Sequence, residues 1–213
     1  MEAGLVKISV KEATLTGNLL IPKDATGLVV FAHGSGSGRH SSRNQAVAKS
    51  LRSVGLGTLL IDLLTEQEGA LDDKTREPRF NISFLAQRLS GITDWLRAES
   101  KTKKLKIGYF GASTGAAAAL VSAAERSDID AIVSRGGRPD LAGKSLMKVK
   151  TPTLLIVGGD DLEVLELNQE ALDLIRTTKD LMVIPGATHL FEEPGALEQV
   201  ANFAEKWFSR FLT

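Results

Sequence analysis

Hydrophobic and polar side chains alternate along the start of the chain, and this pattern changes after residue 27. Residues 5–10 and 13–21 alternate with the period of strands that have one exposed face, and Pro22 ends the second run. This pattern predicts a leading antiparallel hairpin. Later runs are aliphatic but do not alternate, as expected for parallel strands covered by helices on both faces. These later runs cover residues 28–33, 58–63, 105–110, 131–134, 153–157 and 181–184.

Between these runs, hydrophobic residues recur at intervals near 3.6, which is the period of an amphipathic helix. They lie within residues 41–54, at Leu85, Leu89, Ile92 and Leu96, and at Leu197, Val200, Ala204, Trp207 and Phe211. The alternation of strands and helices predicts the α/β class, with a mostly parallel twisted sheet, the hairpin at its N-terminal end and helices on both faces. No internal repeat or linker interrupts the pattern, so we expect one domain over residues 1–213.

Residues 65–81 fit neither period and are rich in charged side chains. We expect this segment to be an irregular surface loop. Its position after a predicted strand places it at the carboxyl edge of the sheet, where ligands of α/β proteins bind. The loop is therefore expected to cover part of a binding site.

The amino-acid composition of the chain argues against several classes of function. With 26 Lys and Arg against 26 Asp and Glu, the chain has no net charge that would attract nucleic acid or an anionic membrane. The absence of cysteine excludes disulfides, thiolate metal sites and a cysteine nucleophile. The N-terminal residues lack the features of a secretion signal, and no apolar run reaches the roughly 18 to 20 residues that span a bilayer. We therefore expect a cytoplasmic protein, monomeric or homodimeric.

The stretch "GYFGASTGAAAAL", residues 108–120, places a serine between glycines at the end of a predicted strand. Gly111, Ser113 and Gly115 form the G-x-S-x-G pattern of a nucleophile held at a sharp strand-to-helix turn. The helix that we expect over residues 114–124 begins directly after Ser113. Its N-terminal N–H groups would face negative charge that develops beside the hydroxyl. Ser113 is therefore the predicted nucleophile.

A serine hydroxyl needs a base, and the chain has three histidines. His33 lies at a strand-to-loop junction, where a structural hydrogen bond is expected, and His40 begins a helix. His189 follows the last predicted strand at the carboxyl edge and is the predicted base. Asp160 and Asp161 both follow another strand, and either could orient the imidazole while the other caps the next helix.

Three motifs together resemble the α/β-hydrolases: residues 111–115, the G-x-x-D-x-x-V run over 158–164, and the Gly-Ala-Thr-His sequence of 186–189. The likeness covers essentially the whole chain and is greatest to the dienelactone hydrolase-like group. It implies the α/β-hydrolase fold without a large cap, with Asp161 as the triad acid. It also implies an oxyanion hole formed by the backbone N–H groups of Ser35 and Thr114.

True dienelactone hydrolases have a cysteine nucleophile where this chain has serine, so the resemblance implies a Ser-His-Asp esterase. The expected substrate is a small ester, thioester or lactone. Only residues 135–152 separate two predicted strands, which is too few for a large helical lid and favours small substrates. We expect no metal and no cofactor, because the three histidines lack the spacing of metal ligands.

Two arginines follow a predicted strand near the expected site. Arg135 and Arg138 could clamp a substrate carboxylate. The alternative is that they form local ion pairs with carboxylates, for which Asp140, Glu192 and Glu193 are the candidates.

The sequence also admits two functions other than ester hydrolysis. The G-S-G-S-G run of residues 34–38, followed by Asp62, imitates a dinucleotide-binding unit, but Arg39 stands where that fingerprint needs its third glycine. A hydrolase fold that binds a ligand without turnover is the other alternative.

Overall fold

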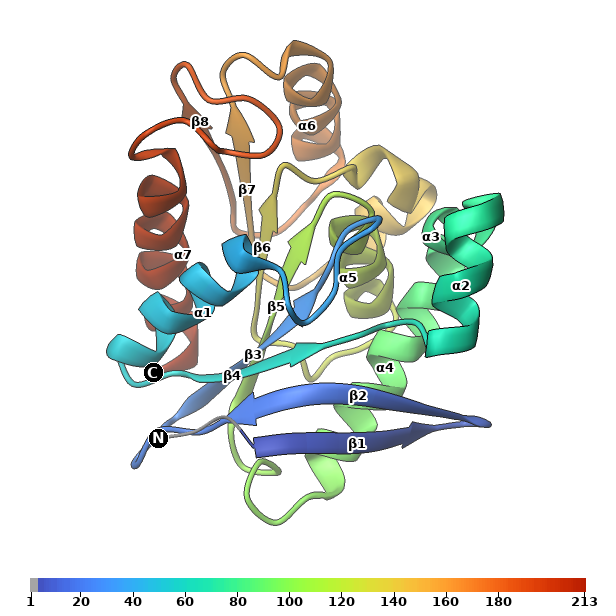
Figure 1. Cartoon of the computed structure of the whole chain (residues 1–213). Helices are drawn as coiled ribbons and strands as arrows, with labels where there is room; N and C mark the ends of the chain where they lie inside the picture. Colours follow the sequence, from blue (N-terminus) through green and yellow to red (C-terminus); the bar gives the residue numbers. More distant parts are fainter. Residues whose placement is uncertain (1–3) are drawn as a thin grey trace.

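The computed structural model describes residues 4–213, which form an eight-stranded sheet in the order β1-β2-β4-β3-β5-β6-β7-β8 (Figure 1). The first pairs, β1 with β2 and β2 with β4, are antiparallel, and all later pairs are parallel. The predicted hairpin and sheet class are confirmed. The strands are β1 (Gly4–Val10), β2 (Ala13–Leu20), β3 (Gly27–Ala32), β4 (Gly57–Ile61), β5 (Lys106–Ala112), β6 (Ala131–Arg135), β7 (Thr153–Gly158) and β8 (Lys179–Ile184).

Helices cover both faces of the sheet (Figure 1). One face packs against α1 (Ser42–Ser53) and α7 (Ala196–Leu212), and the other packs against α4 (Ile82–Ala98), α5 (Thr114–Ala124), the 3₁₀ helix η1 (Pro139–Lys148) and α6 (Leu162–Leu174). Strands enclosed in this way need no polar face, which explains why their sequences do not alternate. Within residues 4–213, no helix combines the length and the apolar character needed to cross a bilayer.

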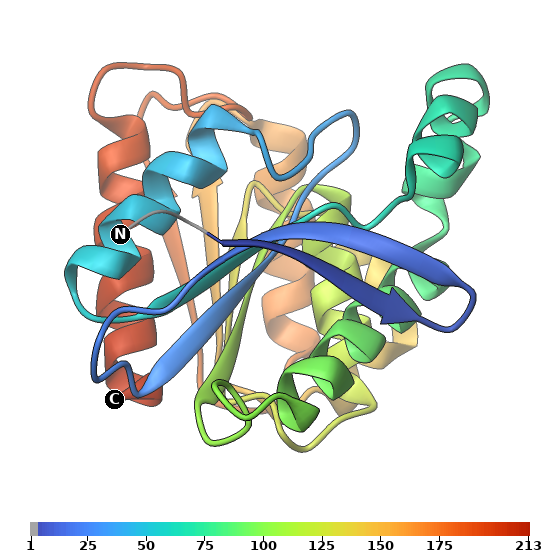
Figure 2. The same ribbon diagram turned by 60° about the horizontal axis from the view of Figure 1, so that its bottom comes forward.

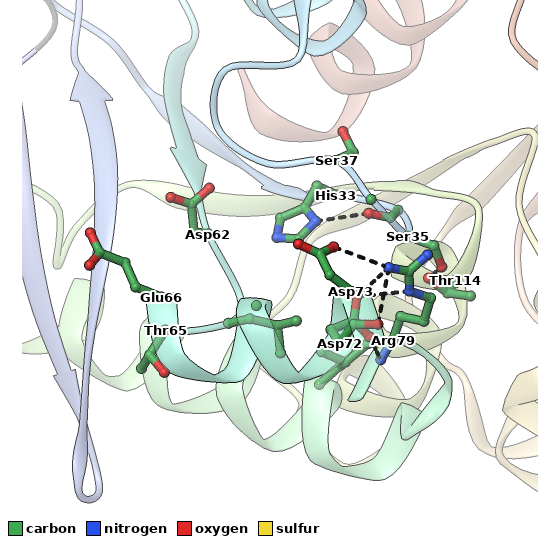
Figure 3. A pocket seen from close by; sticks show the side chains of 15 residues that line it. His33, Ser35, Ser37, Asp62, Thr65, Glu66, Asp72, Asp73, Arg79 and Thr114 are labelled. Carbon is green, nitrogen blue, oxygen red and sulfur yellow. Dashed lines mark hydrogen bonds and ion pairs between the residues drawn. The ribbon is translucent and has the colours of Figure 1, made fainter. Parts of the chain in front are cut away.

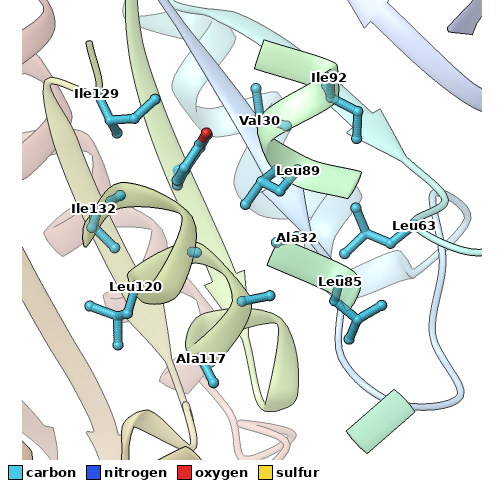
Figure 4. Packing of buried hydrophobic residues seen from close by; sticks show 14 of the residues in the cluster. Val30, Ala32, Leu63, Leu85, Leu89, Ile92, Ala117, Leu120, Ile129 and Ile132 are labelled. Carbon is cyan, nitrogen blue, oxygen red and sulfur yellow. The ribbon is translucent and has the colours of Figure 1, made fainter. Parts of the chain in front are cut away.

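The larger core lies between the sheet and the α4–α5 layer (Figure 4). Leu85, Leu89 and Ile92 belong to the buried stripe of α4, which packs beside α5, the helix that carries Ala117 and Leu120. Helix α5 is buried on all sides, which its run of alanines allows because small side chains let a helix approach both the sheet and a neighbouring helix. This close packing fixes the position of the helix that starts at Ser113.

Residues 65–81 form helices, so the prediction of an irregular loop is wrong. They fold into α2 (Glu66–Thr75) and the short α3 (Glu77–Phe80), joined at Arg76 in the left-handed conformation. The expectation that the segment lies at the carboxyl edge is confirmed, because it lines a pocket there with the loop that follows β3.

Polar contacts hold this helical segment, which explains why hydrophobic periodicity did not reveal it. Thr65 and Glu68 form a capping box at the start of α2, and Glu68 also pairs with Arg88 of α4 at 2.6 Å. The buried carboxylate of Asp72 accepts hydrogen bonds from the backbone N–H and the Nε of Arg79, each at 2.8 Å. The Thr-x-x-Glu sequence of the capping box was the available signal.

We predict that Asp72→Ala loosens the α2–α3 segment, because it leaves Arg79 without its buried partner. Trypsin cleavage after Lys74 and Arg76 is expected to accelerate by about tenfold or more under native conditions, measured by mass spectrometry. The matched control is Asp73→Ala, since the Asp73 side chain is 80% exposed and lies 3.7 Å from Arg79. Equal cleavage rates in the two variants would contradict the prediction.

Candidate active site

The predicted catalytic segments meet at the carboxyl edge of the sheet. The loop after β3, the start of α5, the loop between β8 and α7, and the α2–α3 segment all lie at this edge (Figure 2). In parallel sheets this edge gathers residues that are far apart in the chain, which makes it the usual place for a binding site. The segments named from the sequence are therefore brought together.

Ser113 lies in a strained turn between β5 and α5. Its backbone has φ 50° and ψ −123°, a conformation that costs a non-glycine residue roughly 1 to 3 kcal/mol. Neighbouring backbone supports this turn, because Ser113 N–H donates to the carbonyl of Arg135 at 3.4 Å and the Ser113 carbonyl accepts from Arg138 N–H at 3.1 Å. The Ser113 side chain makes no capping bond to the helix, which leaves the hydroxyl free for another partner.

Gly115 explains the second glycine of the motif. A Cβ atom on this residue would overlap the carbonyl oxygen of Ala32 and lie 2.5 Å from that of His33. The first turn of α5 therefore packs directly against the end of β3. This contact brings the N-terminus of α5 beside the glycine-rich loop.

His189 and Asp161 form a pair across two loops. The Nδ1 atom of His189 lies 2.7 Å from Asp161 Oδ2. An ionised carboxylate only accepts, so Nδ1–H donates to it and the lone pair of Nε2 is free to accept a proton. Asp161 stands at the N-cap position of α6 yet makes no capping bond, whereas the Asp160 side chain is exposed. The geometry thus favours Asp161 as the partner of His189.

The histidine and the serine both contact residues at the end of β6, His189 near Gly136 and Ser113 at Arg135. A Cβ on Gly136 would lie 3.1 Å from the His189 carbonyl and 3.7 Å from its Cε1 atom, and the residue before Gly136 holds Ser113 N–H. In the described part of the chain no hydrogen bond joins Ser113 to His189. Such contacts commonly tighten only when substrate is bound.

The loops that carry the predicted oxyanion donors are in contact. The hydroxyls of Ser35 and Thr114 lie 3.2 Å apart, and Ser37 N–H donates to Gly34 to form a turn in the glycine-rich loop. Within residues 4–213, the backbone N–H groups of Ser35 and Thr114 have no acceptor. Unpaired N–H donors beside a helix N-terminus can stabilise the negative charge of an oxyanion.

A pocket of about 250 Å³ opens beside these donors (Figure 3). The α2–α3 segment forms its other wall, so residues 65–81 cover part of this pocket, as the sequence predicted, although as helices and not as a loop. Four carboxylates lie on the lining, but Asp62 and Asp72 are already paired with arginines, Arg39 and Arg79. The lining residues are His33, Gly34, Ser35, Gly36, Ser37, Asp62, Leu64, Thr65, Glu66, Gly69, Asp72, Asp73, Arg79, Leu85 and Thr114.

His33 makes the structural hydrogen bonds that its position predicted. Its Nε2 accepts from Leu63 N–H at 2.9 Å, so the proton is on Nδ1, which lies 3.0 Å from the Gly34 carbonyl. Desolvation lowers the pKa of His33, against smaller opposing effects of the Gly34 carbonyl and nearby carboxylates. The neutral imidazole thus ties the end of β4 to the glycine-rich loop.

The two arginines considered for a carboxylate clamp have different surroundings. Arg138 forms the ion pair that was the alternative, with two bonds to Asp140 at 2.9 and 2.7 Å. Arg135 is only 7% exposed and donates to Asn44 Oδ1 at 3.3 Å, and within residues 4–213 it forms no ion pair with a carboxylate. Burial, with repulsion from Arg43, lowers the pKa of Arg135 to about 10. Neither arginine lines the pocket, so the clamp stays a prediction.

The features that imitated a dinucleotide site have other roles. Asp62 accepts the backbone N–H of Arg39 at 2.7 Å and pairs with its guanidinium, so its carboxylate is occupied. The strand before the glycine-rich loop is also third in the chain and lies inside the sheet. Over residues 4–213, no group of three or more histidine or acidic side chains is arranged to hold a metal ion.

Comparison with known proteins identifies the family and the fold. A model of the dienelactone hydrolase family matches residues 15–213. The structure is similar to that of a dienelactone hydrolase from Anabaena variabilis ATCC 29413, with 57% identity, a TM-score of 0.98, and coverage of 100% of this chain and 99% of that one. It is also similar in fold to Est1E from Butyrivibrio proteoclasticus, at 18% identity and a TM-score of 0.80, with 98% of each chain covered.

Two curated proteins from strains of Mycobacterium tuberculosis are also similar. Both are named "Putative phosphoribosyl transferase" and are 55% identical to this chain over 204 residues. The matched region is 95% of this chain but 45% of each relative, so the chain spans less than half the length of these proteins.

We predict that His33→Gln reduces the dependence of folding stability on pH. The pKa of His33 is lowered in the folded protein, whereas an unfolded histidine titrates near pH 6.5. Below about pH 6.5 the unfolded chain therefore binds more protons, so the contribution of His33 is complete above that pH and is lost as pH falls toward the folded pKa. Urea denaturation at about pH 7.5 and pH 5 measures the difference for each protein.

The control for this experiment is His40→Gln, which changes an exposed histidine. It is expected to keep the pH dependence of the wild type. A His33→Gln variant whose free energy of unfolding falls as steeply with acidity as that of the wild type would show that His33 is not responsible.

Proposed function

Because the chain belongs to the dienelactone hydrolase family, we propose that it is a serine hydrolase that cleaves small carboxylic esters, thioesters or lactones through an acyl-enzyme. Family membership supports hydrolase activity. The proposal adds a Ser-His-Asp triad of Ser113, His189 and Asp161 in one hydrolase domain. The observation that carries it is the 2.7 Å contact between His189 and Asp161, at the edge where Ser113 occupies a strained turn.

In the proposed acylation step, Ser113 Oγ attacks the ester carbonyl while His189 Nε2 removes its proton. Asp161 holds the imidazole in the correct tautomer and stabilises the imidazolium that forms. The carbonyl oxygen becomes an oxyanion beside the backbone N–H groups of Ser35 and Thr114. Each such donor contributes roughly 3 to 4 kcal/mol to transition-state stabilisation.

To complete the proposed acylation, the oxyanion collapses, His189 gives the proton to the leaving alcohol, and the alcohol departs as the acyl-enzyme forms. In the proposed deacylation, His189 removes a proton from water, the water oxygen attacks the acyl carbonyl, and the same donors stabilise the second oxyanion. This oxyanion collapses, the bond to Ser113 Oγ breaks, His189 returns the proton to that oxygen, and the carboxylic acid is released. One imidazole is sufficient for proton transfer, because in each half-reaction His189 first accepts a proton and then donates it. No metal or cofactor takes part in this scheme.

The proposed substrate class follows from the size and lining of the pocket. A volume of about 250 Å³ is at the lower end for ligand sites and suits a short acyl or alcohol group. The wall combines polar side chains, among them Ser35 and Thr114, with apolar surface from Leu64 and Leu85, which suits a small ester with both polar and apolar parts. Helices α2 and α3 cover this side of the site without enclosing it.

The names of the curated relatives lead to no second proposal. Those proteins are more than twice as long as the region they share with this chain, since that region is 45% of their length. A transferase activity named for the whole protein can reside in the unshared part. A fold that binds ligand without turnover is the alternative that the next experiment tests.

We predict that a fluorophosphonate probe labels the protein at Ser113, as measured by intact mass and peptide mapping. Ser113→Ala is expected to abolish the adduct and to lower kcat for p-nitrophenyl acetate by about 10⁴ to 10⁶, because only the oxyanion donors and binding remain. Ser53→Ala, which changes an exposed serine at the end of α1, serves as the control. A wild-type protein without an adduct, or a Ser113→Ala variant that keeps its activity, would contradict the proposal.

Two adjacent aspartates provide a matched test of the triad acid. Asp161→Asn is expected to lower kcat by about 10⁴, because an amide favours the wrong imidazole tautomer. Asp160→Asn changes the exposed neighbour and is expected to retain nearly full activity. Steady-state rates near neutral pH compare the two, and a larger loss in Asp160→Asn would reassign the acid.

A further inference from the structure

Residues 135–138, which connect β6 to η1, contact the nucleophile on both sides of its strained turn. We refer to them as the 135–138 loop. The Arg135 carbonyl accepts Ser113 N–H at 3.4 Å, and Arg138 N–H donates to the Ser113 carbonyl at 3.1 Å. The position of Ser113 therefore depends on where this loop lies.

The same loop contacts His189 and the nucleophile helix. Gly136 N–H donates to Ile156 of β7 at 2.8 Å, and a Cβ on Gly136 would lie 3.1 Å from the His189 carbonyl. A Cβ on Gly137 would overlap the Ser134 hydroxyl and lie 2.6 Å from Ala116 of α5. The loop is thus packed between the histidine and the start of α5 with no room to shift toward either.

One side chain ties this loop to the helix that begins at the triad acid. Asn168 lies two turns after Asp161 on α6 and is fully buried. Its Nδ2 atom donates to the Gly137 carbonyl at 3.0 Å and to the Val164 carbonyl of its own helix at 2.7 Å. Both N–H groups of the amide are therefore used, and one of them links α6 to the 135–138 loop.

Packing alone does not explain why residue 168 is an asparagine. Asn168 occupies the buried stripe of α6 with Val164 and Ala171, where an apolar side chain would complete the core. Its Oδ1 atom is instead buried without a hydrogen-bond partner in the described part of the chain. Burying an unsatisfied acceptor opposes folding, so the benefit of this residue must lie in the bonds its Nδ2 makes.

From these contacts we infer that Asn168 is a positioning residue, which sets the Asp161–His189 pair relative to Ser113 through the Gly137 carbonyl. The linkage runs from Asp161 along α6 to Asn168, and from Gly137 to the Arg138 N–H that holds Ser113. This inference rests on the proposed triad. Because displacement of a reacting group by about 1 Å can cost on the order of 100-fold in rate, loss of this bond affects the chemical step more than substrate binding.

Two substitutions separate the bond to the loop from the bond within the helix. Asn168→Ser retains a hydroxyl that can bond to the carbonyl four residues earlier, Val164, but it is too short to hold Gly137. Asn168→Ala removes both bonds. Ile175→Val, a conservative change at another buried residue of this region, is the control for a general loss of stability.

For each protein, kcat and KM for p-nitrophenyl acetate, the rate of fluorophosphonate labelling at Ser113 and the urea midpoint are measured. Asn168→Ser and Asn168→Ala are both expected to lower kcat and the labelling rate by about 10- to 100-fold, with KM changed by less than about twofold. Ile175→Val is expected to lower the urea midpoint without this loss of kcat.

The outcomes distinguish this inference from the proposed function. If the wild type labels at Ser113 but Asn168→Ser labels at the wild-type rate, the positioning role is wrong and the triad stands. If Ile175→Val loses as much kcat for a given fall in the urea midpoint as the Asn168 variants do, the role of Asn168 is merely structural and the inference is again wrong. If the wild type does not label, the proposed function itself fails.

Discussion

The close approach of α5 to the end of β3 is the constraint on which the site depends. With only hydrogen on the α-carbon of Gly115, the helix can begin against the carbonyls of Ala32 and His33. That contact forces the sharp turn at Ser113 and places the helix N-terminus beside the glycine-rich loop. The buried alanines of α5 extend the same fit along the helix. The proposed nucleophile, Ser113, and the helix N-terminus beside it thus have one structural origin.

Polar contacts and buried apolar side chains together hold the loops at this edge. His33 joins the glycine-rich loop to Leu63, Asp62 holds Arg39, and Asp72 holds Arg79. The loop between β8 and α7 is also fixed by burial, because Phe191 lies in the hydrophobic core. Two of the four carboxylates on the pocket lining, Asp62 and Asp72, form ion pairs with arginines. These two carboxylates therefore stabilise the loops as well as line the pocket.

Patterns that reflect burial predicted the fold well. The hairpin, the parallel strands and the main helices have hydrophobic patterns set by the faces they bury, and the structure has them within a few residues of the expected bounds. Residues 65–81 lacked such a pattern because α2 buries little apolar surface, with Asp72 as its one buried residue. Periodicity cannot reveal a helix held by a capping box and ion pairs, although Thr65 and Glu68 carried that signal.

The sequence by itself determined the order of strands and helices, the strand-to-helix context of Ser113 and the candidates for its partners, because these depend on local pattern and on residue chemistry. Only the tertiary structure placed Asp161, and not Asp160, against His189, paired Arg138 with Asp140 and buried Arg135 beside Asn44. It also placed the Asn168 amide against Gly137. These choices depend on distances between segments far apart in the chain, which local composition does not encode.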